Sequence, residues 1–266
     1  MKRFVLILLS IFTCAIATAA TETINWYMDG NTYATTTCQT GGDIVLPQNT
    51  PTKYGYTFQG WRDYKPIEYL ESTGTQWIDT GVILNENSKI RAKFLRTTVF
   101  SSQEGDTMGI MGSSQAYNAK KVVFYGQASN AKYIEAAFIS GANYKPFQLE
   151  ARVSGTIIAE SSKYERTIYN SADVIVAHST AINNLQSFTT IETARLFNAS
   201  GEKVLPFVGR IYYAQIWDND VLIRDFIPVI DGNDVPCMYD KVGGKFYYNI
   251  NPVNQDNFFA GPIINE

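Results

Sequence analysis

The chain has 266 residues and a nearly balanced charge, with 22 Lys and Arg against 25 Asp and Glu and a formal net charge of −3. The sequence contains neither a basic run nor a stripe of mixed aromatic and basic residues, so we expect no nucleic-acid partner. Aromatic residues make up 14% and charged residues 18%, which is typical of a β-rich extracellular domain and not of a disordered or helical chain.

The first residues have the pattern of a secretory signal peptide, residues 1–19. Lys2 and Arg3 precede an apolar run over residues 4–16, and small residues around Ala19 follow it. The alternative is a membrane anchor, but the run is shorter than the roughly 20 residues that span a bilayer. We expect cleavage after Ala19 and an exported protein without a membrane span, located in the cell envelope, on the cell surface or outside the cell. Cleavage removes Lys2 and Arg3, which leaves 20 basic residues against 25 acidic ones.

Residues 20–64 form the first predicted unit. Strands are expected at 23–28 and 32–37, because both runs are short, β-rich and separated by the turn residues Asp29-Gly30-Asn31. A second glycine-rich turn, at 41–43, precedes a stretch with the sequence PTKYGYTFQGW, residues 51–61.

This unit resembles a single Listeria-Bacteroides repeat of the internalin B-repeat type. The resemblance is carried by Leu46-Pro47 and by residues 51–61, which follow the repeat's pattern of L-P and then P-T-K-x-G-Y-T-F-x-G-W. It implies a small β-grasp-like module of the kind found in bacterial surface proteins. Trp61 is then expected to anchor the core of the module, since only an exposed ring could stack on a ligand.

Pro66 marks the expected boundary, so the second predicted unit covers residues 65–266. Residues 88–95 alternate apolar and basic side chains and predict a half-buried strand. The best place for one short turn of helix is 179–186. Further short apolar runs between Gly, Ser, Asn and Asp clusters predict strands and a sandwich; these runs are 76–82, 108–112, 122–126, 133–139, 147–153, 156–160, 166–169, 174–177 and 188–197.

The clearest strand and turn pattern lies in residues 203–249. Two β-rich runs, 208–217 and 221–229, flank the turn cluster Asp218-Asn219-Asp220 and predict a hairpin. Further along, Gly243-Gly244 separates two more short runs, because glycine adopts the positive φ angles of a tight turn without steric cost.

The two ends of this second unit resemble a concanavalin A-like, LamG-like jelly-roll domain of exported bacterial proteins. The stretches that carry the resemblance are EYLESTGTQWIDTG, which begins at Glu68, and the strand and turn pattern of residues 209–249. The resemblance implies an all-β sandwich in which the first and last strands lie near one another. Many relatives of such a fold bind sugars or proteins on loops or on a concave face, although a fold does not by itself fix a function.

The sequence assigns no catalytic residue. His178 is the only histidine and has no nucleophile motif beside it, so we interpret it as a surface or strand-end residue. A glycoside hydrolase needs two carboxylates that face one cleft, and the nearest pairs are Glu104 with Asp106 and Glu68 with Glu71. Both pairs lie in stretches rich in Gly or Ser, so we interpret them as solvated turns and expect no enzyme.

Two acidic turns are candidate metal ligands, namely Asp218-Asn219-Asp220 and Asp231-Gly232-Asn233-Asp234. Calcium is the expected ion if a metal binds, because it takes carboxylate and carbonyl oxygens from loops. The favoured interpretation is that both are ordinary hairpin turns, which leaves the metal site unassigned. After signal cleavage Cys38 and Cys237 remain, and they either form one disulfide or, as we favour, stay unpaired.

Aromatic residues give the remaining binding signal, and the candidates are Trp77, Tyr212, Tyr213, Trp217, Tyr247 and Tyr248. Strand alternation places Tyr213 and Trp217 on one face and Tyr212 on the other, so at least half of the set is expected in the core. The sequence therefore names no ligand-binding residue.

These observations predict an exported, non-catalytic protein of the bacterial cell envelope that recognises a glycan or a surface protein. The alternatives are a glycan-cleaving hydrolase on the same fold and a structural surface spacer. No cofactor is expected beyond the calcium ion considered above.

Overall fold

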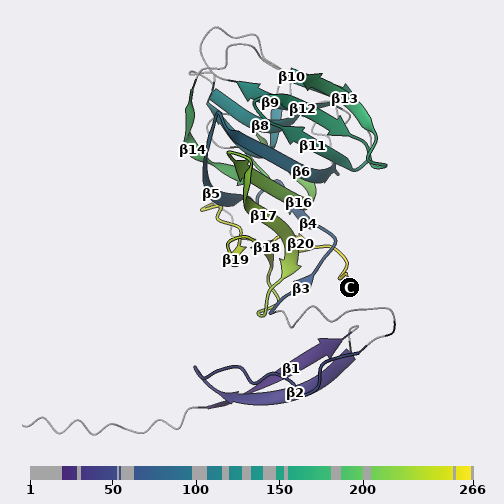
Figure 1. Cartoon of the computed structure of the whole chain (residues 1–266), viewed down its shortest axis with the longest axis vertical. Coiled ribbons are helices and arrows are strands. Elements are labelled where there is room, and N and C mark those ends of the chain that lie inside the picture. The colour runs from purple at the N-terminus through teal and green to yellow at the C-terminus, as the bar shows by residue number, and fades with distance from the viewer. Residues whose placement is uncertain are drawn as a thin grey trace, which may run out of the picture. The chain divides into compact units, whose positions relative to one another are not determined.

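The structure is a computed structural model that describes residues 20–28, 31–52, 54, 63–97, 107–115, 120–127, 133–139, 148–152, 155–180, 187–199, 205–253 and 256–264. The predicted signal peptide lies outside these ranges. All regular elements within them are strands, so the predicted all-β class is confirmed (Figure 1). No helix in these ranges has the length and hydropathy that crossing a membrane requires.

The chain divides into two compact units, with the boundary between Trp61 and Arg62. Among the described residues of the small unit, the sheet is one antiparallel hairpin of β1 (Thr21–Met28) and β2 (Asn31–Gln39). Trp26 is buried between these strands, and its indole N–H donates a hydrogen bond to Thr36 Oγ1 at 2.8 Å. Most of the predicted repeat motif, including Trp61, lies outside the described residues.

The large unit contains two sheets. Within the described residues the first sheet has seven strands, β5 (Ile78–Asn85), β7 (Thr107–Gln115), β8 (Lys120–Gln127), β9 (Tyr133–Ile139), β10 (Gln148–Arg152), β14 (Thr189–Leu196) and β15 (Leu205–Pro206). The second has eleven, β3 (Lys65–Pro66), β4 (Leu70–Thr73), β6 (Ser88–Arg96), β11 (Ile157–Ser161), β12 (Glu165–Tyr169), β13 (Ile175–Thr180), β16 (Val208–Asp218), β17 (Val221–Ile230), β18 (Pro236–Asp240), β19 (Lys245–Tyr247) and β20 (Phe259–Ala260).

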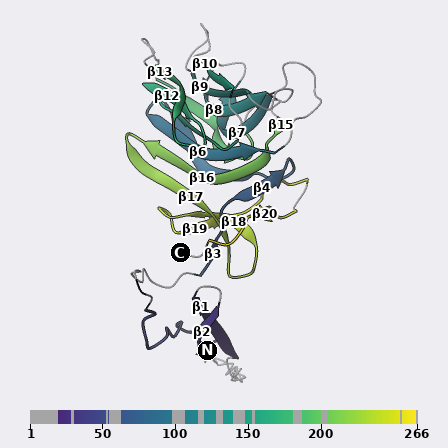
Figure 2. The same ribbon diagram turned by 90° about the vertical axis from the view of Figure 1, so that its right-hand side faces the viewer.

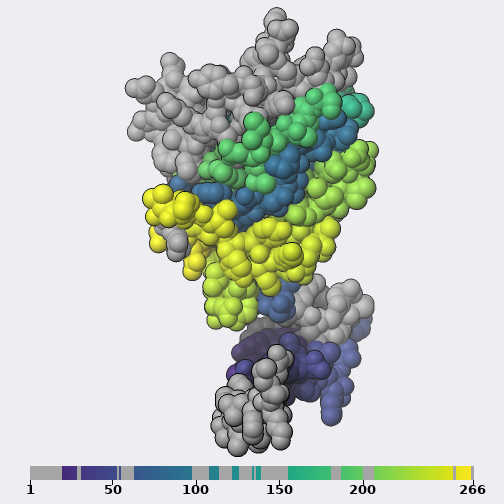
Figure 3. Space-filling model, turned by 90° about the vertical axis from the view of Figure 1, so that its left-hand side faces the viewer, coloured from purple at the N-terminus to yellow at the C-terminus, as the bar shows by residue number. Residues whose placement is uncertain are grey.

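The strand order of the eleven-stranded sheet is β13-β12-β11-β6-β16-β17-β18-β19, and the labels follow this order in Figure 1. Strand β6 therefore pairs with β11 on one side and with β16 on the other, although these strands are far apart in the sequence. The space-filling view shows the same mixing, because early, middle and late segments of the large unit lie next to one another on its surface (Figure 3). Residues from distant parts of the chain can thus share one face.

The two ends of the large unit lie side by side, as the predicted sandwich requires. Strand β4 pairs with β16 and with β20, and Ile67 forms a bridge with Ile263. Figure 2 shows β4 beside β20. The two terminal stretches that carry the jelly-roll resemblance are therefore neighbours in space.

The core lies between the two sheets. On β6 the buried residues Ile90, Ala92 and Phe94 alternate with Lys89, Arg91 and Lys93, which confirms the predicted half-buried strand. Phe94 contacts Phe207 edge-on at 6.1 Å between ring centroids, and further ring pairs continue the packing. The larger cluster of buried apolar residues draws on both sheets, so the sandwich is held together mainly by apolar burial.

The predicted turn between β16 and β17 has the expected conformation, and the predicted helical turn does not. Asn219 and Asp220 both have positive φ, 47° and 63°, as a two-residue hairpin turn requires. In contrast, Ser179 and Thr180 extend strand β13, because they pair with β12, and residues 181–186 lie outside the described ranges. The helix prediction is therefore wrong for its first two residues.

Gly209 is a close-packed position on β16, which makes it a test of the packing. A Cβ atom there would lie 2.3 Å from the Leu95 carbonyl oxygen and 2.6 Å from the Phe207 ring. We expect Gly209→Ala to lower the free energy of unfolding by about 2–3 kcal/mol, because the backbone of β6 cannot move aside freely. The control is Gly232→Ala, where the nearest atom is 3.6 Å away and the expected change is within about 0.5 kcal/mol. If both variants lost the same free energy of unfolding in urea, the close pairing of β16 with β6 would be contradicted.

Candidate functional site

A β-bulge in β16 determines which side chains face outward from the large sheet. Ile211 pairs with Phe94 and Tyr213 pairs with the adjacent residue, Lys93, so Tyr212 is an extra residue in β16. Such a bulge places two residues opposite one and breaks the alternation of side chains.

Both tyrosines of the bulge consequently lie on the outer face. Lys93 Nζ lies 5.8 Å from the centre of the Tyr212 ring, and the Tyr213 side chain hydrogen-bonds to Arg91. Lys93 and Arg91 both point away from the core, since they alternate with the buried residues of β6. The prediction that Tyr212 and Tyr213 occupy opposite faces is therefore wrong, because strict alternation does not hold across a bulge.

Aromatic and basic side chains from four strands or their flanks meet on this surface, which we call the aromatic–cation face. Its rings come from the segment before β4, from β12 and from β16, and its cations come from β6 and β16. The members are Tyr69, Tyr169, Tyr212, Tyr213 and Trp217, with Lys89, Arg91, Lys93 and Arg210 and the acids Glu71 and Glu160.

Cations lie against several of these rings. Lys89 Nζ is 4.3 Å from the centre of the Trp217 ring, and the Arg210 guanidinium is 4.1 Å from that of Tyr69. Both distances are within the range of a favourable cation–π contact. Tyr69 also packs edge-on against Tyr212 at 5.7 Å, so neighbouring rings support each other's orientation.

Arg91 is the most connected residue of the aromatic–cation face. Its Nη1 atom donates to Glu160 Oε2 at 3.3 Å, and its guanidinium lies 5.8 Å from the Tyr169 ring centre. Burial of the guanidinium lowers its pKa, but the hydrogen bond with Tyr213 and the charge of Glu160 outweigh burial and raise the pKa. Arg91 therefore stays charged and holds residues of three strands together.

The face is closely packed. Ile158 pairs with Lys93 and so points outward, yet only 5% of it is exposed. The long side chains around it must cover it, which leaves a continuous surface of rings and charged groups above the sheet.

The other three predicted aromatic residues lie elsewhere. Trp77 and Tyr247 pack against the core, where the Trp77 ring contacts Arg195 at 4.2 Å and Tyr247 meets Phe226 at 5.1 Å. Tyr248 donates its hydroxyl hydrogen to Asp231 Oδ2 at 2.7 Å. The three predicted aromatic residues on β16 therefore lie together on the outer face, and the other three lie apart from them.

A second group of rings lies beside β18 and β19. Tyr64, Tyr239 and Phe246 pack on one another with centroid distances of 4.6–6.2 Å, and Phe246 also contacts Tyr248 at 6.5 Å. We call this the four-ring cluster. Because its rings pack on one another, less of their aromatic surface is free to contact a ligand than the number of rings suggests.

The candidate catalytic residues are held in separate contacts. His178 lies on β13 with its side chain 40% exposed, and its Nε2 atom is 3.4 Å from Glu165 Oε1. Glu68 is exposed, whereas Glu71 Oε2 accepts a hydrogen bond from Arg210 Nε at 2.8 Å. Glu104 and Asp106 lie outside the described residues. Glu68 and Glu71 therefore have different environments and do not form a matched pair of carboxylates.

One aspartate of each acidic turn accepts hydrogen bonds from other groups of the chain. Asp218 Oδ1 accepts a hydrogen bond from Asn85 Nδ2 at 2.9 Å. Asp231 Oδ1 accepts backbone N–H groups of Asn233 and Val235 at 2.9 and 2.8 Å. Burial raises the pKa of Asp231, but these bonds and that of Tyr248 outweigh it and lower the pKa.

Two neighbours of Asp231 have a raised pKa, because burial is not outweighed there. Burial raises the pKa of Tyr248, which the hydrogen bond to Asp231 raises further, and it raises the pKa of the Cys237 thiol to about 12. Cys38 lies in the small unit and Cys237 is buried in the large unit, and each is a free thiol in this structure. Among the residues described, no group of three or more His, Cys, Asp or Glu is placed to hold a metal ion.

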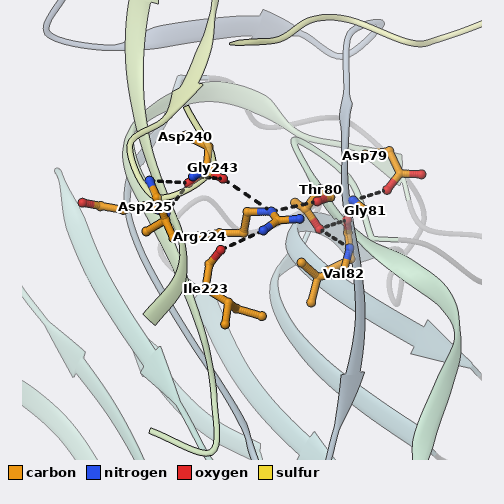
Figure 4. Close-up of polar contacts among 11 residues, drawn as sticks. Asp79, Thr80, Gly81, Val82, Ile223, Arg224, Asp225, Asp240 and Gly243 are labelled. Carbon is orange, nitrogen blue, oxygen red and sulfur yellow. Dashed lines mark hydrogen bonds and ion pairs between the residues drawn. The ribbon is translucent and has the colours of Figure 1, made fainter. Parts of the chain in front are cut away.

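An ion pair on the inner side of β17 fixes the sheet that carries the aromatic–cation face (Figure 4). Arg224 Nε lies 3.6 Å from Asp240 Oδ2 and donates to the Thr80 carbonyl of the opposite sheet at 3.3 Å. Asp240 is fully buried and also accepts the backbone N–H groups of Asp225, Val242 and Gly243. This cluster links β17, β18 and β5 and so has a structural role.

Sequence reasoning missed several members of the aromatic–cation face, namely Tyr69, Tyr169 and its cations. The alternating basic residues of β6 are visible in the sequence, but they indicate only that one side of the strand faces solvent. Their neighbours become known only with the strand order, which places β16 and β11 on either side of β6.

Comparison with known proteins adds a distant structural likeness. No protein-family model and no curated protein matches the sequence. Among solved structures, the chain is similar to a proposed carbohydrate binding protein from Bacteroides ovatus ATCC 8483, with a TM-score of 0.44 and 12% sequence identity. The similarity covers 76% of this chain and 62% of that protein's chain. A likeness this distant does not transfer a function, so the site must be judged from its own residues.

Proposed function

We propose that this protein is an exported, non-catalytic glycan-recognition protein of the bacterial cell envelope and that the aromatic–cation face binds the glycan. The observation that carries the proposal is the bulge in β16. It turns Tyr212 and Tyr213 to the same side of the sheet as Trp217, beside charged groups that can form hydrogen bonds.

The chemistry of the face suits a sugar. A sugar ring has apolar C–H surfaces that pack on aromatic rings, and it has hydroxyl groups that donate and accept hydrogen bonds. Tyr and Trp offer large, rigid apolar area with a polar tip, and Arg and carboxylate groups form strong, directional hydrogen bonds. Gln215 and Asp225 extend the polar surface beside Trp217, joined by a hydrogen bond of 2.9 Å.

A role without catalysis is supported by the state of the acids on the face. Glu71 and Glu160 are each held by an arginine, so both carboxylates already serve as ion-pair partners on the face. The alternative is a glycan-cleaving hydrolase, for which sugar release from a bound glycan would be the sign. A structural spacer is the other alternative.

Export and family membership are part of the same proposal. The basic, apolar and small-residue pattern of residues 1–19 supports export, and the motif at residues 46–61 supports a repeat module of bacterial surface proteins. Neither feature identifies the glycan.

The test is binding of the purified protein to a broad glycan array, with and without a calcium chelator. We expect specific binding that survives chelation, because one aspartate of each acidic turn, Asp218 and Asp231, already accepts hydrogen bonds within the chain. Loss of glycan binding on chelation would indicate that calcium is a cofactor. Release of sugar on long incubation would favour the hydrolase. An array without any bound glycan would contradict the proposal and favour protein adhesion or a spacer role.

A further inference from the structure

The charges of the aromatic–cation face do not cancel. Four cations, Lys89, Arg91, Lys93 and Arg210, share the face with two carboxylates, Glu71 and Glu160. Asp225, which extends the polar surface beside Trp217, forms an ion pair with Lys241 at 2.7 Å, so that pair adds no net charge. The chain as a whole has a formal charge of −3, so this surface differs in sign from the average of the molecule.

The arginines and the lysines have different partners. Arg210 pairs with Glu71 at 2.8 Å, and Arg91 pairs with Glu160 at 3.3 Å. Lys89 Nζ is 3.9 Å from Glu160, which is too long for a hydrogen bond, and Lys93 forms no ion pair with a described residue. The positive charge in excess is therefore carried by the two lysines of β6.

Each of these lysines lies beside a ring of the proposed glycan surface. Lys89 contacts Trp217 and Lys93 contacts Tyr212. A cation–π contact does not use all three N–H donors of an ammonium group, so each lysine keeps donors that can bond an anion. A sugar stacked on these rings would thus place an acidic substituent close to a lysine.

From this arrangement we infer that the face selects acidic polysaccharides, in which the sugar carries a carboxylate or a sulfate group, over neutral ones. The inference rests on the proposed glycan-binding function. Nucleic acid is a less suitable polyanion, because the sequence has no basic run and the chain as a whole is negatively charged.

Matched pairs of polysaccharides test the inference. Polygalacturonate and its methyl ester share a backbone and differ in charge, and dextran sulfate and dextran do the same for sulfate. We expect the protein to bind at least one acidic chain about tenfold or more tightly than its neutral counterpart at 50 mM salt. Affinity for that acidic chain should fall about sevenfold between 50 and 200 mM salt, as two neutralised charges on a single chain require. The two pairs also distinguish carboxylate from sulfate recognition.

Variants locate the effect. The double variant Lys89→Gln/Lys93→Gln keeps polar side chains and removes both charges, so it should lose most of the preference for the acidic chain. Its affinity for the acidic chain should fall by a larger factor than its affinity for the neutral one. The matched control is Lys163→Gln, a lysine that lies 5.3 Å from the ring of Tyr164 in the turn before β12. It should leave both affinities unchanged.

The outcomes separate this inference from the proposed function. Equal binding of acidic and neutral chains would overturn the charge selection and leave glycan recognition intact, whereas no binding of any polysaccharide would overturn both. Tighter binding of single-stranded DNA than of either acidic polysaccharide, at the same salt, would replace glycan recognition with nucleic-acid binding. An unchanged preference in the double lysine variant would also overturn the inference.

Discussion

Replacing Asp240 with alanine is expected to lower the free energy of unfolding of the large unit by about 3–5 kcal/mol. Asp240 is fully buried and accepts hydrogen bonds from three backbone N–H groups, those of Asp225, Val242 and Gly243, at 2.9–3.1 Å. It also lies 3.6 Å from the Arg224 guanidinium. Its removal takes one acceptor from each of these four groups, and two of them, the N–H groups of Val242 and Gly243, belong to the tight turn after β18.

The matched control is Asp234→Ala. Asp234 also pairs with a cation, Lys65 at 2.8 Å, but its side chain is 79% exposed, so the loss should be about 1 kcal/mol or less. The conservative variant Asp240→Asn keeps one acceptor oxygen and should lie between the two. Urea unfolding followed by circular dichroism measures all three variants, and similar losses for Asp234→Ala and Asp240→Ala would contradict the structural role of the buried aspartate.

The second large effect concerns binding. Trp217→Ala is expected to weaken binding of the glycan found on the array by about 30-fold, which corresponds to the roughly 2 kcal/mol typical of a buried aromatic anchor at an interface. Trp217 supplies the largest ring of the aromatic–cation face and holds Lys89 beside it at 4.3 Å. Isothermal titration of the variant and the unmodified protein measures the change.

Two further variants make this result specific. Tyr164→Ala removes an exposed ring that also contacts a lysine, outside the aromatic–cation face, and should leave the affinity unchanged. Phe246→Ala disrupts the four-ring cluster and should have little effect on affinity. A large loss in Phe246→Ala with none in Trp217→Ala would move the binding site to the four-ring cluster.

Much of the fold could be predicted because local patterns decide it. The alternation on β6, the hairpin of β16 and β17, and the glycine turn before β19 depend on residues close together in the sequence. Strand boundaries differ from the predictions by a few residues at most, since pairing partners extend a strand beyond its most β-rich core. The short helix failed at Ser179 and Thr180 because pairing with β12 extends β13 through both residues.

The candidate site was only half predictable for a physical reason. Tyr212, Tyr213 and Trp217 were recognised as candidates from their residue types, but the bulge that brings all three to one face depends on how β16 pairs with β6. Pairing between strands that are far apart in the sequence produces no motif with a fixed residue spacing. The same holds for the cations, since β6 and β16 are more than 100 residues apart and become neighbours only in the folded sheet.

The central claim is that glycan contacts the outer face of β16, and the indole N–H signals of the tryptophans test it most directly. The chain has four tryptophans, of which Trp217 lies on the aromatic–cation face, Trp77 packs against the core and Trp26 belongs to the small unit. In a nuclear magnetic resonance titration with the bound glycan, we expect the Trp217 signal to shift while those of Trp77 and Trp26 stay in place. A titration that shifts Trp77 or Trp26 and leaves Trp217 unchanged would contradict the account.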